Sequence, residues 1–211
     1  MCAPVIIVNL RLANDEGIVV GILHRSKQLN PQCAQRSLNI IWLEALMEVS
    51  SVSSFLDYYG KIRERTLRVV CCIPPEKFDW TYKEGKFSLA DLIRHIAAIE
   101  RYMYAETVQM RPSRYPGHGK ELADGPENVL AFMNRLHAES TEIFSRLSDE
   151  DLKKKCLTPA GTPIGIGKWL RALVEHEIHH RGQIYVYLSM LGISTPPIYG
   201  LTSEEVRARS Q

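Results

Sequence analysis

The chain has 211 residues, of which 45% are hydrophobic and 24% are charged, and its formal net charge is +2. This composition fits a soluble globular protein with one substantial core, and neither its charge nor its apolar runs call for a nucleic acid or a membrane as partner. Because there is no secretory signal pattern and the five cysteines include no C-x-x-C pair, we expect a cytoplasmic protein with reduced thiols.

Residues 1–46 differ in pattern from the rest of the chain. "VIIVNL" and "GIVVGIL" are strand-like apolar runs, and the polar stretch that follows them has no helical period. Two isolated strands are only marginally stable without a partner surface. We therefore interpret residues 1–46 as an N-terminal extension. In an alternative reading Met47 is the natural start, and the preceding residues are not part of the natural protein.

Residues 47–206 show apolar side chains at three- and four-residue spacings, interrupted by Pro and Gly clusters. The pattern predicts four long helices, at about 48–72, 88–103, 126–147 and 168–190, followed by a polar tail at 207–211. A short helix is expected at "SDEDLKKK". The predicted fold class is all-α, a four-helix bundle.

Local signals support two of the helix starts. Ser88 is a good N-cap with Asp91 three residues later, and Pro126 is a favoured first-turn residue. The loop "RPSRYPGHGKELADG" between the second and third helices is long enough to cross the bundle, so a crossover connection is expected there.

The run "EHEIHHRGQ" in the fourth helix raises the question of a metal site. At about 100° per residue, His176, His179 and His180 share one helix face, together with Gln183 and Tyr187. His176 and His180, one turn apart, can chelate one metal ion through their ring nitrogens.

The same run contains H-E-x-x-H, the signature of zinc proteases. A protease would need a third ligand on a later element, but the only acidic residues after the run are Glu204 and Glu205, in a polar tail. No predicted sheet precedes the helix either, so we reject this reading. Glu177, the formal protease glutamate, is expected on the outer face of the helix in a weak pair with Arg181.

A third ligand is available upstream of the pair. His95 lies on the apolar side of the second helix, where an unpaired ring would be costly. His137 on the third helix is a rival for the same reason, and His118, in a loop, is a weaker one. The loops around Trp80, Tyr115 and Tyr199 are expected to shape any pocket beside the site.

The sequence resembles the DinB-like metal-binding four-helix bundles, which include bacillithiol and mycothiol S-transferases and thiol-dependent isomerases. The resemblance covers about 47–206 and is carried by "FSLADLIRHIAAIE", "TPAGTPIGIGKWLRALVEHEIHHRGQIYVYLSMLGI" and "PPIYGLTSEEV". It implies that His95, His176 and His180 form a tripod on a divalent metal and that His179 is not a ligand. Residues 1–46 have no counterpart in the family.

The resemblance and the open tripod imply a metal-dependent transferase that activates a low-molecular-weight thiol toward an electrophilic substrate. The expected metal is zinc first, with nickel or iron as alternatives, because imidazole ligands suit all three. Gln183 and Tyr187 are expected to orient the substrate. A metal-dependent hydrolase and a non-catalytic metal-binding or stress-response bundle remain alternatives. A homodimer formed through "YVYL" is also an expectation.

Overall fold

The computed structural model describes residues 49–210. The helices are α2 (Val52–Val70), α3 (Leu89–Ile99), α4 (Ala105–Thr107), α5 (Pro126–Ser145), α6 (Ile166–Met190) and α7 (Ser203–Arg209), and the strands are β1 (Lys155–Leu157) and β2 (Pro163–Gly165). The strand-like runs and the extension predicted for residues 1–46 lie outside the described residues. None of the described helices is both long enough and apolar enough to cross a bilayer.

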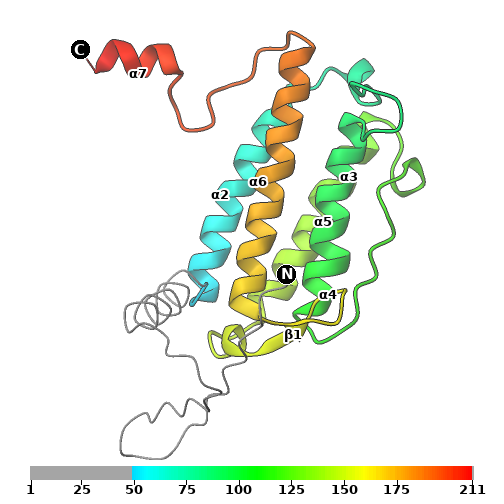
Figure 1. Ribbon diagram of the computed structural model, residues 1–211, viewed down its shortest axis with the longest axis vertical. Coiled ribbons are helices and arrows are strands. Elements are labelled where there is room, and N and C mark those ends of the chain that lie inside the picture. The colour runs from blue at the N-terminus through cyan, green and yellow to red at the C-terminus, as the bar shows by residue number, and fades with distance from the viewer. Residues whose placement is uncertain (1–48, 211) are drawn as a thin grey trace, which may run out of the picture. The chain divides into compact units, whose positions relative to one another are not determined.

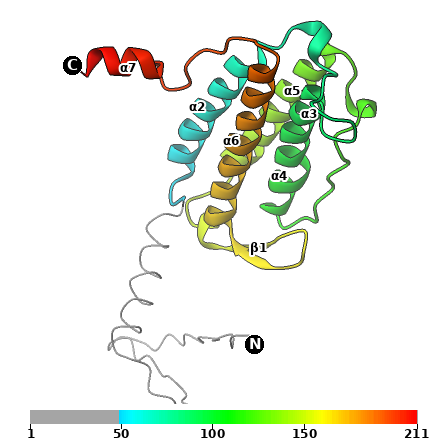
Figure 2. The same ribbon diagram turned by 45° about the horizontal axis from the view of Figure 1, so that its top comes forward.

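Helices α2, α3, α5 and α6 form a four-helix bundle (Figure 1). Helix α2 packs against α5 and α6, and α3 packs against the same two helices. Figure 1 shows α2 and α6 running in one direction and α3 and α5 in the other, so α3 and α5 are parallel neighbours. The chain between them must therefore return along the bundle, as the long green segment does in Figure 2. The predicted all-α bundle and its crossover connection are confirmed.

The helix starts follow from local chemistry. The Ser88 hydroxyl accepts from the Asp91 backbone N–H while the Asp91 carboxylate accepts from that of Ser88, which is a complete capping box at the start of α3. Pro126 is the first residue of α5 and loses no helical hydrogen bond there. The short helix expected at "SDEDLKKK" is a 3-10 turn at Asp151–Lys153.

A π-helical segment, Glu100–Tyr104, joins α3 to α4. The wider turn shifts the phase of the buried face, so that Glu100 and Tyr104 are buried while Tyr102 is only half-buried. The regular three- and four-residue spacing predicted for this helix therefore ends at Ile99.

Strands β1 and β2 form an antiparallel hairpin immediately before α6, with Cys156 paired to Ile164. The sequence predicts only a Gly- and Pro-rich connection at this place, without strands. Each strand has only three residues, too few for an alternating pattern to be visible in the sequence.

Two apolar clusters fill the bundle, and buried charge separates them along the helices. On α6, Val174 belongs to one cluster and Ile184 to the other. Between them Glu177 is 0% exposed and Arg181 is 2% exposed. We call this layer, which comprises Arg63, Glu100, His137, Glu177 and Arg181, the charged layer.

The charged layer is held together by Arg63 on α2. Its Nη2 donates to the Glu100 carboxylate and lies 2.9 Å from Glu177 Oε2. Nδ1 of His137 lies 2.8 Å from the other oxygen of Glu100. Burial alone would lower the pKa of Arg63, but the carboxylates of Glu177 and Glu100 outweigh it and raise that pKa. Arg63 thus links two carboxylates from different parts of the bundle.

Candidate metal centre

Three histidine rings from α3 and α6 converge on one point between these helices. His95, His176 and His180 each offer one ring nitrogen, and the three atoms lie within 4.8 Å of one another. We call these residues the histidine triad. Nε2 of His176 and Nε2 of His95 are 3.1 Å apart. Two nitrogens bound to one zinc-like ion at about 2.0–2.1 Å lie about 3 Å apart, so the observed spacing fits a shared metal.

Hydrogen bonds on the opposite ring nitrogens orient two of the three rings. Nδ1 of His95 lies 2.7 Å from the hydroxyl of Tyr115, and Nδ1 of His180 lies 2.7 Å from Oε1 of Gln183. Because Oε1 can only accept, His180 carries its proton on Nδ1 and presents a bare Nε2. Nδ1 of His176 is buried without a hydrogen-bond partner in the described part of the chain. Hydrogen bonds such as those of His95 and His180, made by the ring nitrogen that faces away from the other rings, are typical of metal-ligating histidines.

The environment keeps the triad neutral at physiological pH. Burial, reinforced by the neighbouring rings, lowers the pKa of His95 to about 4 and that of His176 to about 3. Burial also lowers the pKa of His180, against the opposing effect of its bond to Gln183. Neutral imidazoles are the form that binds a metal, so the rings need not lose protons before binding.

Comparison with known proteins shows the family of the chain. The profile of the DinB superfamily matches residues 58–184, which include all three histidines of the triad. The chain belongs to the DinB superfamily. It is 27% identical over 153 residues to the uncharacterized protein YjoA of Bacillus subtilis (strain 168), covering 70% of this chain and 93% of YjoA.

Solved structures of DinB-like proteins share the fold. A DinB-like protein from Bacillus cereus matches with a TM-score of 0.60 at 18% identity, over 71% of this chain and 98% of the other. YfiT from Bacillus subtilis, a probable metal-dependent hydrolase with an unusual four-helix bundle topology, matches with a TM-score of 0.55 at 20% identity, over 68% and 89%. At these identities the matches establish the fold and nothing finer.

The two rival histidines of this DinB-superfamily chain lie outside the triad. His137 belongs to the charged layer through Glu100. His118 is nearer, since its Nδ1 lies 3.3 Å from the Tyr115 hydroxyl, and its ring packs against Phe87. His118 therefore contacts the surroundings of His95 but is not among the three converging nitrogens.

Glu177 corrects the sequence analysis. We expected it on an outer face, in a weak pair with Arg181, but it is fully buried and its ion pair is with Arg63. The reason is that α6 packs against α3 on one side and α2 on another, so the face turned away from the triad meets α2 rather than solvent. The glutamate of the H-E-x-x-H pattern thus belongs to the charged layer.

Gln183 and Tyr187, the other two predicted site residues, differ in their contacts with the histidine triad. Gln183 uses both ends of its amide, since Oε1 accepts from His180 while Nε2 lies 3.3 Å from Nε2 of His179. Tyr187 lies one turn further and packs edge-on against Trp80 and Tyr82. Gln183 is therefore in contact with the triad, and Tyr187 belongs to an aromatic cluster beyond it.

Sequence reasoning missed the role of Tyr115. It was named only as a residue of a pocket-shaping loop, yet its hydroxyl contacts His95 directly. Tyr115 lies 20 residues after His95 in the crossover segment, where no periodic pattern links the two positions. The available signal was the length of that segment, which has to run back alongside α3 and so past His95.

Proposed function

We propose that this DinB-superfamily protein is a divalent-metal-dependent enzyme acting on small molecules, and that it transfers a low-molecular-weight thiol to an electrophile. The observation that supports the proposal is the triad itself. Three neutral imidazoles converge, and within residues 49–210 no fourth His, Cys, Asp or Glu joins them. A structural zinc site normally has four protein ligands, whereas three protein ligands leave a position open for chemistry.

A divalent metal held by these residues would supply a full positive charge, which lowers the pKa of a thiol or water brought to it. Zinc is the first choice, and nickel or iron are the alternatives, since imidazole suits each. The chain's own residues would then position the reaction. Tyr115 and Gln183 orient two ligand rings, and Phe87 packs edge-on against the His95 ring.

A metal-dependent hydrolase is the second candidate. It is supported by the similarity in fold to YfiT, which carries that description. The same triad would serve either reaction, because an activated water and an activated thiol differ only in the nucleophile. The two candidate functions are therefore distinguished by the nucleophile that the protein uses, a thiol or water.

The test is a comparison of nucleophiles on protein purified without a polyhistidine tag and loaded with zinc, nickel or iron. Small thiols are supplied with a chromogenic electrophile, and a p-nitrophenyl ester is supplied alone. We expect a thiol-dependent rate above that of thiol alone, abolished by chelation and in His95→Ala. Ester hydrolysis without any thiol rate would favour the hydrolase. Metal bound with no rate in either assay would leave a non-catalytic metal-binding bundle as the better account.

A further inference from the structure

A cavity of about 640 Å³ opens between the beginning of the crossover segment and the β1–β2 hairpin. The crossover segment contributes 110–113 and Tyr115, and the hairpin contributes 155–159. We call this cavity the hairpin pocket. Its volume falls within the range of small-molecule sites, which is about 300–1,000 Å³.

The charged residues that line the hairpin pocket, among those described, are all basic. Arg111 and Lys155 line it, and the described lining residues include no acidic side chain. Within residues 49–210, no carboxylate forms an ion pair with Lys155, and the one that pairs with Arg111, that of Glu106, is 3.9 Å from its Nη1. Met110 and Leu157 add apolar wall. The lining therefore suits an anionic group carried on an apolar body.

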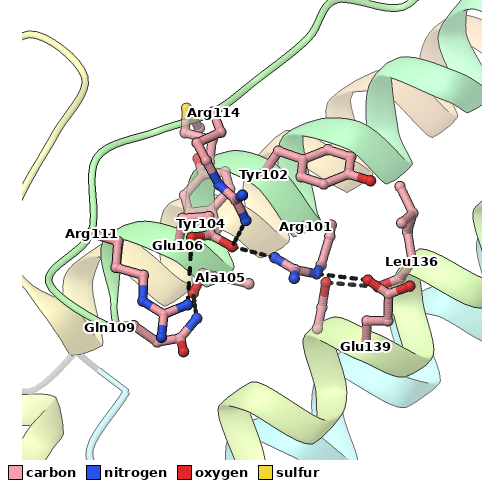
Figure 3. Close-up of polar contacts among 12 residues, drawn as sticks. Arg101, Tyr102, Tyr104, Ala105, Glu106, Gln109, Arg111, Arg114, Leu136 and Glu139 are labelled. Carbon is pink, nitrogen blue, oxygen red and sulfur yellow. Dashed lines mark hydrogen bonds and ion pairs between the residues drawn. The ribbon is translucent and has the colours of Figure 1, made fainter. Parts of the chain in front are cut away.

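A buried carboxylate fixes the crossover wall of the pocket. Glu106 is 1% exposed, and its carboxylate lies 2.5 Å from Arg101 Nη1 and 2.7 Å from Arg114 Nη2, with the two arginines approaching it from different directions (Figure 3). Burial would raise the pKa of Glu106, but the hydrogen bonds from Arg114 and Arg101 outweigh it and lower that pKa. The backbone N–H of Arg111 donates to the Glu106 carbonyl, and that of Arg114 donates to the carbonyl of Tyr102. This wall is thus preformed, which reduces the ordering cost of binding.

The hairpin pocket adjoins the histidine triad through Tyr115. Tyr115 is one of the residues that line the pocket, and its hydroxyl lies 2.7 Å from Nδ1 of His95. A second wall residue, Thr107, accepts a hydrogen bond from Nε1 of Trp169 on α6. A molecule in the pocket would therefore lie one side chain away from a triad ring.

We propose that the hairpin pocket binds the carboxylate end of an amphipathic small molecule, with Arg111 and Lys155 as the anion-binding pair. In the context of the proposed function, on which this reading rests, that molecule is the electrophilic substrate. The binding step itself requires no metal, so the two proposals can fail separately.

The test uses 2-naphthoate and its neutral analogue 2-naphthamide, titrated calorimetrically into the full chain with and without bound metal. We expect naphthoate to bind at least about tenfold more tightly than naphthamide, because hydrogen bonds from charged donors to a carboxylate are stronger than those to a neutral amide. Lys155→Met and Arg111→Met should each lose about tenfold of the naphthoate affinity. The matched control is Lys153→Met, because Lys153 is 70% exposed, pairs with Glu150 and is absent from the pocket lining.

Two results would overturn the proposal. One is a failure of the expected selectivity. It would be seen as equal affinity for the acid and the amide, or as naphthoate binding that both pocket variants leave unchanged. The other is naphthoate binding that chelation or His95→Ala abolishes while Lys155→Met leaves it intact, which would place the anion on the triad metal. If no metal binds but naphthoate still depends on Lys155 and Arg111, the pocket stands and the proposed function fails.

Discussion

The histidine triad and the charged layer both include residues of α6, yet they differ in how their buried polar groups are paired. In the charged layer, Arg63 forms ion pairs with the carboxylates of Glu100 and Glu177. In the triad, the inward ring nitrogens face only one another, and burial keeps the rings neutral. Buried charges held in ion pairs are read most simply as structural, whereas neutral ring nitrogens that converge within 4.8 Å of one another indicate a ligand site.

His137 shows how the distinction works for a single residue type. Like His95, it was a candidate ligand from its place on the apolar side of a helix. The structure sets the two apart by their partners, since Nδ1 of His137 meets the Glu100 carboxylate and Nε2 of His95 meets another ring. The partner, rather than the residue type or its burial, separates a structural histidine from a candidate ligand.

The largest expected effect comes from breaking the charged layer. Arg63→Met would leave the buried carboxylates of Glu100 and Glu177 without their cation, so we expect a loss of about 3–5 kcal/mol in the free energy of unfolding. Urea denaturation followed by circular dichroism measures it. Lys61→Met on the same helix, which breaks an exposed pair with Asp57, should cost less than about 1 kcal/mol.

A rescue variant separates lost charge pairing from lost packing. Adding Glu100→Gln and Glu177→Gln to Arg63→Met removes the unpaired charges, so much of the stability should return. If Arg63→Met is as mild as Lys61→Met, the layer is not held by the ion pairs described above.

The second effect concerns metal affinity and tests the triad against its rival. His95→Ala should weaken binding of zinc or nickel by more than about a hundredfold, exceeding the range of outer-shell changes. His137→Ala should leave the affinity nearly unchanged and instead reduce stability, because it removes a partner of Glu100. Competition against a chromogenic chelator measures the affinity. The reverse pattern would show that the third ligand is His137.

Much of this architecture could be predicted from the sequence because its signals are local. Ser88, Pro126 and the Pro- and Gly-rich breaks mark helix ends, and the spacing of His176 and His180 places them on one face. His95 rested on the family resemblance together with its apolar position. The bundle is confirmed; metal binding by the three histidines remains a prediction.

The parts that could not be predicted depend on tertiary neighbours. A helical wheel gives the angle between Glu177 and His176 but not the number of helices around α6, so Glu177 was assigned to solvent. The π-helical segment places Glu100 in the core, and it contains no Pro or Gly that would have predicted the change. Tyr115 reaches His95 only because the crossover segment returns alongside α3.

A third, smaller effect should come from the outer hydrogen bonds of the triad. Gln183→Ala and Tyr115→Phe each remove the partner of one Nδ1 atom, and such partners are typically worth about 10- to 100-fold in metal affinity. The same chelator competition applies. Tyr102→Phe is a matched control, since Tyr102 is half-buried but contacts no triad ring. Equal affinities in all three variants would limit Gln183 and Tyr115 to packing.

The smallest expected effect is a pH dependence of stability in the metal-free protein. The pKa values of His95, about 4, and His176, about 3, lie below the usual value of about 6.5 in an unfolded chain. As the pH falls below about 6.5, the unfolded chain takes up protons on these rings before the folded protein does, so stability should be lost between about pH 6.5 and 3. Removing both rings with His95→Ala and His176→Ala should make this loss shallower, as urea denaturation at a series of pH values would measure. His179→Ala on the same helix is the control, because the His179 side chain is exposed and lies outside the triad. An identical slope in the double variant would mean that the triad already exchanges protons freely with solvent, and the contrast with the ion pairs of Arg63 in the charged layer would then disappear.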